Sequence, residues 1–474
     1  MRLAGRSARY LAGACLVFLF SATALGQHDV DAHVSRIEVL VADSASPGLV
    51  VAVVQGDDML LERGFGVRDV ESGRAVSADM AFRNGSTTKM MVAAALLEAL
   101  AECGLDPQQA IGGYVPDLDP AIGRLSVHQL LTHTSGLADK ADDFGLHDES
   151  ALAKNVLAKS ADDFFAVPGE VYSYSNPGYD IAGFVLAILD RAPFADAFRA
   201  RILGPAGMQR SMFRATMAMT YPFALPHRQT DSGDVEVIRP MPDNSAEWPS
   251  GLMYTTAGDL AAFGRLLLDQ GRAADGDAVI NSATVDALTA PRVAVPGADH
   301  GASYGYGIGL LTVGDTPLWR HTGGIAGFST VLTIVPNRKL VIAIMMNGPD
   351  DDLIDGVESL LLEALADVRM ALPEPEPLPL SSTVVSALAG QYGQVEPELE
   401  LRADAIGLRV ITPDGESLGQ LLRVDDSMPV SRFAIVDDGE IAGRASVTWS
   451  ADGKPRFLHD GSRAMTRLSP DTGP

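Results

Sequence analysis

Ser86 and Lys89 stand three positions apart at the start of an apolar stretch that predicts a helix. Residues 86–103 are mostly good helix formers, and Gly104 follows as a helix stop. At this spacing the serine hydroxyl and the lysine amine share one helix face, so the amine can reach the hydroxyl. A lysine takes the proton of a serine only if burial or neighbouring cations lower its pKa. The pair therefore predicts an activated serine nucleophile.

Two later segments support this interpretation, which Ser-x-x-Lys cannot carry alone because the pattern also arises by chance. Tyr174-Ser175-Asn176 lies in a loop between Pro168-Gly169 and Pro177-Gly178, ahead of another apolar helical stretch. His321-Thr322-Gly323-Gly324 precedes the strand-like run 328–335. Ser-x-x-Lys, then Tyr-x-Asn, then a basic residue with Thr-Gly at a strand edge form a three-part signature.

With this signature the chain resembles the serine β-lactamase and penicillin-binding-protein family. The resemblance is to the class C-like branch, which also contains DD-peptidases, D-aminopeptidases and esterases, and it extends from about Pro47 to about Asn347. It implies an α+β fold, with an antiparallel sheet flanked by helices and a helical subdomain. Four further segments carry the resemblance: Leu130–Leu137, Ile202–Met208, Ser250–Leu252 before Asp259-Leu260, and Tyr304–Gly309.

The resemblance implies that Ser86 attacks the scissile carbonyl and that Lys89 and Tyr174 share the proton transfer. Which of the two is the base stays open, because a tyrosinate at neutral pH needs a pKa several units below the usual value of about 10. The oxyanion hole is expected to consist of the backbone N–H groups of Ser86 and Gly324. Asn176 is expected to orient Lys89 or the acyl side chain.

His321 is the one departure from class C β-lactamases, which carry lysine at this place. Certain DD-peptidases and D-aminopeptidases resemble this chain here, so the resemblance implies weak β-lactamase activity. His321 and Thr322, followed by Gly323, are expected to face a substrate carboxylate. An imidazole with the usual pKa of about 6.5 would carry its charge only below that pH. His133, in Leu-Thr-His-Thr-Ser-Gly, is expected to be structural and to stay outside the site.

Three functions remain open. The favoured one is an exported hydrolase that forms an acyl-enzyme and acts on D-amino-acid peptides, β-lactams or small esters. The second is an esterase or D-aminopeptidase with little β-lactamase activity, and the third is a protein that binds cell-wall peptides without turnover. No cofactor is expected, and no His-x-His or His-Glu-x-x-His spacing predicts a metal site. The formal charge of −25 opposes binding to nucleic acid and anionic membranes.

The N-terminal residues 1–26 have the pattern of a secretory signal peptide. Arg2, Arg6 and Arg9 precede the apolar stretch 10–20 and the small residues before Gly26. We therefore expect a periplasmic or secreted protein without a membrane span, because this apolar stretch is too short to cross a bilayer. Lipidation at Cys15 is disfavoured but stays open. Cys103 would then be the remaining cysteine, which excludes an intramolecular disulfide and suggests a small apolar helix residue.

A chain of 474 residues predicts more than one domain. Residues 27–370 form the expected hydrolase domain, with strands at 49–54, 59–67, 306–312, 328–335 and 340–346 and a last helix at 351–368. Alternating prolines make residues 371–382 an extended linker that few contacts should cross. Residues 383–474 contain short apolar runs separated by hairpin signals such as Asp438-Gly439, which predict a small all-β barrel or sandwich.

Overall fold

The larger part of the molecule is built on one antiparallel sheet. The computed structural model describes residues 33–140, 142–371 and 376–468, so the predicted signal peptide and Cys15 lie outside the described residues. The sheet has eight strands in the order β2-β1-β12-β11-β10-β9-β8-β7. In that order the strands are Asp58–Gly66, Gly48–Gln55, Leu340–Met346, Phe328–Val335, Thr316–Ile325, Gly309–Val313, Ser303–Tyr304 and Val293–Ala294.

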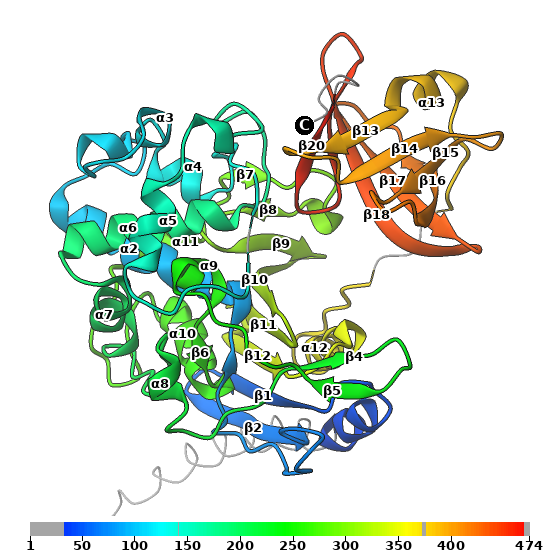
Figure 1. Cartoon of the computed structure of the whole chain (residues 1–474). Helices are drawn as coiled ribbons and strands as arrows, with labels where there is room; N and C mark the ends of the chain where they lie inside the picture. Colours follow the sequence, from blue (N-terminus) through cyan, green and yellow to red (C-terminus); the bar gives the residue numbers. More distant parts are fainter. Residues whose placement is uncertain (1–32, 141, 372–375, 469–474) are drawn as a thin grey trace, which may run out of the picture.

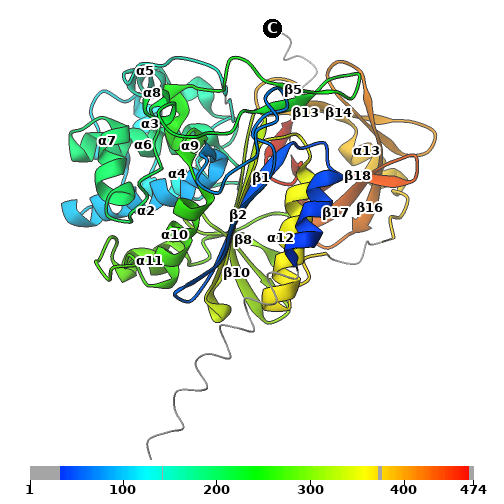
Figure 2. The ribbon, with the colours of Figure 1, turned by 90° about the horizontal axis from the view of Figure 1, so that it is seen from below.

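Both faces of the central strands are apolar because helices cover each of them. Alternate residues of β1 point to opposite faces, so Val50 and Ala52 belong to one core cluster and Val51 and Val53 to another. The second cluster includes α12 (Asp351–Ala366) and the helix 33–42, which lie side by side in Figure 2. The first cluster includes α2 (Thr88–Cys103) and α10 (Ala257–Leu268). The sheet thus forms the middle layer of the fold.

The helical subdomain surrounds α2, the helix that follows Ser86. Every residue of α2 from Thr88 to Leu100 is buried, and the helix ends at Gly104 in the left-handed conformation, as its sequence predicts. Cys103 is the last residue of the helix, as expected of a small helix residue, but it is exposed. The main helix against α2 is α6 (Asn176–Asp190). The further elements outside the eight-stranded sheet and before the barrel are α3 (Pro120–Gly123), α4 (Val127–Leu131), α5 (Ala151–Leu157), α7 (Phe194–Phe198), α8 (Ala215–Ala218), α9 (Trp248–Gly251), α11 (Ser282–Leu288), β3 (Phe82–Arg83), β4 (His227–Gln229), β5 (Val235–Val237) and β6 (Tyr254–Thr255).

The C-terminal part is a closed barrel of eight strands, β13 to β20. Its core consists of inward residues such as Leu408, Phe433 and Val447. The expected fold class, α+β with a small all-β C-terminal domain, is therefore confirmed. The barrel elements are α13 (Ser382–Leu388), β13 (Gly390–Gly393), β14 (Leu399–Ala403), β15 (Leu408–Ile411), β16 (Ser417–Asp425), β17 (Val430–Asp437), β18 (Glu440–Trp449), β19 (Pro455–His459) and β20 (Ala464–Arg467).

The segment predicted as a linker does not behave as a free spacer over its described part. Residues 372–375 lie outside the described residues, and the boundaries 371–382 stay a prediction. Within 376–382, the backbone of Leu378 exchanges two hydrogen bonds of 2.8 Å with Arg423 of β16. This half of the segment therefore belongs to the surface of the barrel. Within the described residues, no helix has the length and apolar character that a membrane span requires.

The expectation that few contacts join the two domains is wrong. An apolar cluster spans them, with Val171 on one side and Phe457 and Ala464 on the other. Backbone hydrogen bonding also crosses the boundary, because the Tyr174 N–H donates to the carbonyl of Ser462 over 2.9 Å. The barrel is therefore anchored at the loop that carries the Tyr-x-Asn motif.

Candidate active site

Ser86 lies in a tight 3-10 turn, η1 (Gly85–Thr87), that leads directly into α2. Side-chain hydroxyls hold the turn, since Thr87 Oγ1 donates to the Asn84 carbonyl over 2.9 Å and Thr88 Oγ1 to the Gly85 carbonyl over 2.8 Å. Gly85 has φ +55°, a conformation that favours glycine. The turn leaves Ser86 half-buried at the N-terminal end of the helix.

Lys89 lies fully buried one turn below the nucleophile. Its Nζ is 3.0 Å from Ser86 Oγ, donates to Asn176 Oδ1 over 2.7 Å, and donates to the carbonyl of Ser250. A deprotonated lysine amine has two N–H bonds and one lone pair. Because Asn176 and Ser250 accept both N–H bonds, the lone pair is directed at the Ser86 hydroxyl. This is the geometry that a base for Ser86 requires.

The environment of Lys89 also favours its neutral form. Burial lowers the pKa of Lys89 to about 7, although Asp139, Asp180 and Glu247 raise it in part. Asp180, which is one turn beyond Asn176 on α6, is itself fully buried, and burial raises its pKa. Burial therefore brings the neutral amine within reach near neutral pH.

Tyr174 lies beside the lysine with its ring 4.9 Å from Lys89 Nζ. Its hydroxyl is buried and, within the described residues, has no hydrogen-bond partner of good geometry, although Ser86 is close enough to lower its pKa slightly. Burial outweighs that contact and raises the pKa of Tyr174 above its usual value. Burial therefore favours the neutral phenol form of Tyr174, which makes Lys89 the better candidate for the base.

The third motif lies on β10, which packs directly against the nucleophile turn. A Cβ added to Gly323 would lie 2.3 Å from the Asn84 carbonyl oxygen and 2.9 Å from the Ser86 backbone nitrogen. A Cβ on Gly85 would lie 2.7 Å from the Gly324 nitrogen. The two backbones touch without intervening side chains, which brings the Ser86 and Gly324 amides together. Thr322 and Gly324 are exposed on the open side of the strand.

His321 faces the opposite way and is buried. One ring nitrogen, Nε2, lies 2.8 Å from the Tyr304 hydroxyl, and Nδ1 lies 2.6 Å from the Thr322 carbonyl. Burial and the nearby Lys89 lower the pKa of His321 to about 3. The usual imidazole pKa of about 6.5 assumes exposure to solvent, and the burial of His321 removes that condition.

His133 supports the Tyr-x-Asn loop from behind. The Ser175 N–H donates to His133 Nδ1 over 3.0 Å, and Nε2 lies 3.3 Å from the Tyr304 hydroxyl that also contacts His321. The His133 ring centre is 4.1 Å from that of Tyr174. His133 is thus the structural histidine that the sequence predicts, placed immediately behind the site.

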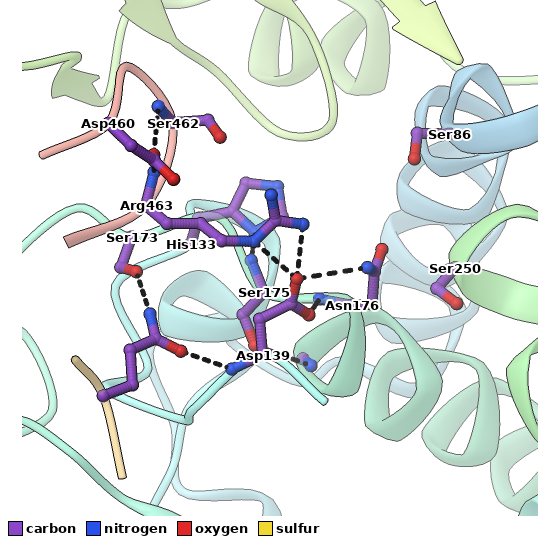
Figure 3. Close-up of polar contacts among 12 residues, drawn as sticks. Ser86, His133, Asp139, Ser173, Ser175, Asn176, Ser250, Asp460, Ser462 and Arg463 are labelled. Atoms are coloured by element: carbon purple, nitrogen blue, oxygen red, sulfur yellow. Dashed lines mark hydrogen bonds and ion pairs between the residues drawn. The ribbon is translucent and has the colours of Figure 1, made fainter. Parts of the chain in front are cut away.

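Sequence reasoning missed a second group of polar residues, shown in Figure 3. Asp139 accepts from the backbone N–H of Asn176 over 2.8 Å and from its side-chain amide over 3.4 Å. Arg463, from the turn between β19 and β20, donates Nε–H to Asp139 over 2.6 Å. Gln394 bonds to the Asp139 backbone N–H at 2.7 Å and to Ser173 Oγ at 3.0 Å. No local pattern joins these residues, since Asp139 and Arg463 are 324 positions apart.

Among the described residues, no group of three or more His, Cys, Asp or Glu side chains could hold a metal ion. The residues of the site instead suit acyl transfer: a serine, a neutral amine, a neutral phenol and two adjacent backbone amides.

Comparisons with known proteins agree with this chemistry. A sequence profile of the family described as Beta-lactamase matches residues 34–364. Penicillin-binding protein 4 of Amycolatopsis lactamdurans is 31% identical over 373 residues, which cover 75% of this chain and 96% of that protein.

Solved structures share the fold at lower identity. SurE, crystallised with D-Leu, has a TM-score of 0.73 and 23% identity over 93% of this chain and 100% of its own, so the likeness extends into the barrel. The D-amino acid amidase of Ochrobactrum anthropi SV3 has a TM-score of 0.57 and 21% identity, covering 72% of this chain and 98% of its own. From the profile and the first of these relatives, the chain belongs to the β-lactamase family of serine hydrolases.

Proposed function

We propose that this protein is an exported serine hydrolase that forms an acyl-enzyme on Ser86 and cleaves amide or ester bonds of small D-amino-acid compounds. The observation that carries the proposal is the buried Lys89 amine, 3.0 Å from Ser86 Oγ with both remaining N–H bonds accepted. A non-catalytic binding protein would not need a lysine whose pKa burial lowers to about 7.

In the acylation step Ser86 Oγ bonds to the substrate carbonyl carbon while its proton passes to Lys89 Nζ. The oxygen of the tetrahedral intermediate accepts hydrogen bonds from the backbone N–H groups of Ser86 and Gly324. The bond to the leaving group then breaks, and the leaving nitrogen or oxygen takes the proton of the neutral Tyr174 hydroxyl. Lys89 returns its proton to Tyr174, so the enzyme ends the step with its original protons and an ester on Ser86.

Deacylation repeats these transfers with water in place of serine. A water molecule gives a proton to Lys89 as its oxygen bonds to the ester carbonyl, and Ser86 Oγ recovers a proton when it leaves. The product is a carboxylic acid, and no cofactor is consumed.

The neutral His321 favours esters and D-amino-acid amides over β-lactams. The family resemblance assigns recognition of a β-lactam carboxylate to the place where class C β-lactamases have lysine, and a buried imidazole with a pKa of about 3 supplies no charge there. Relatives crystallised with D-Leu and with D-phenylalanine make D-amino-acid compounds the first candidates to test. β-Lactam hydrolysis is the weaker, second candidate.

The decisive experiment incubates the protein lacking residues 1–26 with a p-nitrophenyl ester, a D-amino-acid amide, a D-Ala-D-Ala peptide and a fluorescent penicillin. Turnover is measured for each, and intact-mass and peptide mass spectrometry locate any adduct. We expect an adduct on Ser86, turnover of the ester and at least one D-amino-acid compound, and none of either in Ser86→Ala, which opens almost no cavity. Equal turnover by Ser86→Ala would exclude the mechanism.

Export is part of the proposal and is supported by the arginines and apolar stretch within residues 1–26. Fractionation of cells that express the full chain, followed by N-terminal sequencing of the exported form, tests it. We expect an N-terminus at or close to Gln27, and retention of the uncut chain in the cytoplasm would contradict this part.

A further inference from the structure

One chain of hydrogen bonds runs from the C-terminal barrel to the nucleophile. It starts at Arg463 and passes to Asp139 and Asn176, as Figure 3 shows. From Asn176 it continues to Lys89 and ends at Ser86. No residue of the barrel belongs to the three-part signature, so the chain of contacts adds a second domain to the machinery. Because it reaches the amine that serves as base, its charges act on catalysis.

Asp139 determines which way the Asn176 amide points. The Asp139 carboxylate accepts from both the backbone N–H and the side-chain amide of Asn176. The amide nitrogen is thereby directed at the carboxylate, and the amide oxygen is left to accept from Lys89 over 2.7 Å. If the amide turned over, an N–H group would face the lysine N–H groups and the contact would be lost.

Arg463 in turn holds Asp139. The Asp139 side chain is only 5% exposed, and an unpaired carboxylate in that position would be costly. The guanidinium contacts Asp139 Oδ2 through both Nε and a terminal nitrogen and lies 5.6 Å from the centre of the Tyr174 ring. Its backbone is fixed as well, because Asp460 accepts from the N–H groups of Ser462 and Arg463.

The two charges have opposite effects on Lys89. The carboxylate of Asp139 raises the pKa of Lys89, and the guanidinium of Arg463 lowers it. Other groups face the amine from every side. Those are Asp180 and Tyr179 on α6, Glu247 before α9, Tyr174 and His133 in the loops, and His321 on β10.

We propose that Arg463 of the barrel is a positioning residue that acts through Asp139 and Asn176 to hold the Lys89 amine against Ser86. The inference rests on the proposed function for its effect on rate, but the charge state of Lys89 is measurable without any substrate. The barrel thus completes the active site and is not an appendage to it.

The first test measures the ionisation of Lys89 directly, in the full chain without residues 1–26. The sequence has six lysines, so NMR of protein labelled with 13C at the lysine ε-carbon gives few signals, and Lys89→Met assigns the one of interest. We expect Arg463→Gln to raise the pKa of Lys89 by about one unit and Asp139→Asn to lower it by a similar amount. Arg463→Lys keeps the charge and should restore most of the shift.

The second test uses activity. The acidic limb of kcat/KM for a neutral ester should move upward in Arg463→Gln, so that its rate at pH 6 falls roughly tenfold, and downward in Asp139→Asn. The double variant should lie closer to wild type than either single variant.

Arg444→Gln is the matched control, because it removes another ion pair between the domains, with Asp299 at 2.8 Å, that has no path to Lys89. The acidic limb of the kcat/KM profile of Arg444→Gln should lie at the same pH as that of wild type. If the Lys89 pKa is the same in wild type, Arg463→Gln and Asp139→Asn, the inference is wrong whatever the rates are. Opposite shifts of the NMR pKa in a protein without Ser86-dependent turnover would support the inference and refute the proposed function.

Discussion

Replacing Gly323 by alanine is a sharp test of how the active site is assembled. The added Cβ would lie 2.3 Å from the Asn84 carbonyl oxygen and 2.9 Å from the Ser86 nitrogen. Carbon and oxygen do not approach more closely than about 3.3 Å, so β10 and the nucleophile turn must separate by about 1 Å. Both neighbours are backbone and no flexible side chain can yield. The Gly324 amide then moves away from the place where the oxyanion develops.

Loss of one such donor costs about 3 to 4 kcal/mol of barrier, so we expect kcat for the ester to fall roughly 100-fold or more. KM should change little, because the donor acts mainly on the developing oxyanion. The assay is steady-state hydrolysis of a p-nitrophenyl ester, with thermal unfolding recorded for each variant.

Gly324→Ala is the control, since its Cβ would meet nothing within 4 Å and its N–H remains. Its kcat should stay within a few-fold of wild type. If Gly323→Ala keeps more than about a tenth of the wild-type kcat, or if the two variants lose activity equally, the proposed apposition of the two amides is not what stabilises the oxyanion.

Three further outcomes follow from the same geometry. The kcat/KM of wild type should rise with pH through about 7, as Lys89 loses its proton. It should then stay level to about pH 9, because Tyr174 remains protonated. A fall in kcat/KM near pH 8 would contradict the neutral phenol. KM for a penicillin should not change between about pH 5 and 8, since the pKa of His321 is about 3. A KM that falls as the pH is lowered through about 6.5 would instead show that a protonated His321 binds the penicillin carboxylate. A chain that ends at residue 371 should acylate at least roughly tenfold more slowly than the full chain, because Tyr174 and Asp139 lose their barrel partners. An unchanged acylation rate in the folded fragment would show that the barrel is dispensable.

The sequence predicts the fold where local pattern and burial coincide. The runs 328–335 and 340–346 are continuous and apolar because helices cover both faces of the sheet, and β11 and β12 have these bounds. Within the ten-residue strand β10 only the motif stands out in the sequence, because Pro317 and two glycines have low strand propensity. Backbone pairing with β9 and β11 on both sides stabilises the extended conformation of β10 despite this low propensity.

For the site, the three-residue spacing of Ser86 and Lys89 predicts that their side chains meet, but it does not predict how deeply each site residue is buried. The usual imidazole pKa does not carry over to His321 for that reason, since its pKa depends on how tightly Tyr304 and the strand enclose the ring. Asp139 and Arg463 could not be predicted at all, because a contact between distant segments depends on how the two domains dock. The acidic stretch after Gly136 offered no means to single out one carboxylate.

The exposed thiol of Cys103 allows a label to be attached at the C-terminal end of α2, the end opposite Ser86. Cys103 closes the helix that begins beside Ser86, about 21 Å along the axis from Lys89 at 1.5 Å per residue. A chain without residues 1–26 has this one cysteine, so a fluorophore attached there is unique. The helix between label and nucleophile is buried from Thr88 to Leu100, which makes it a rigid rod. Energy transfer from the label to a chromophoric acyl group on Ser86 would therefore time acylation and deacylation in single turnovers, without any substitution in the site.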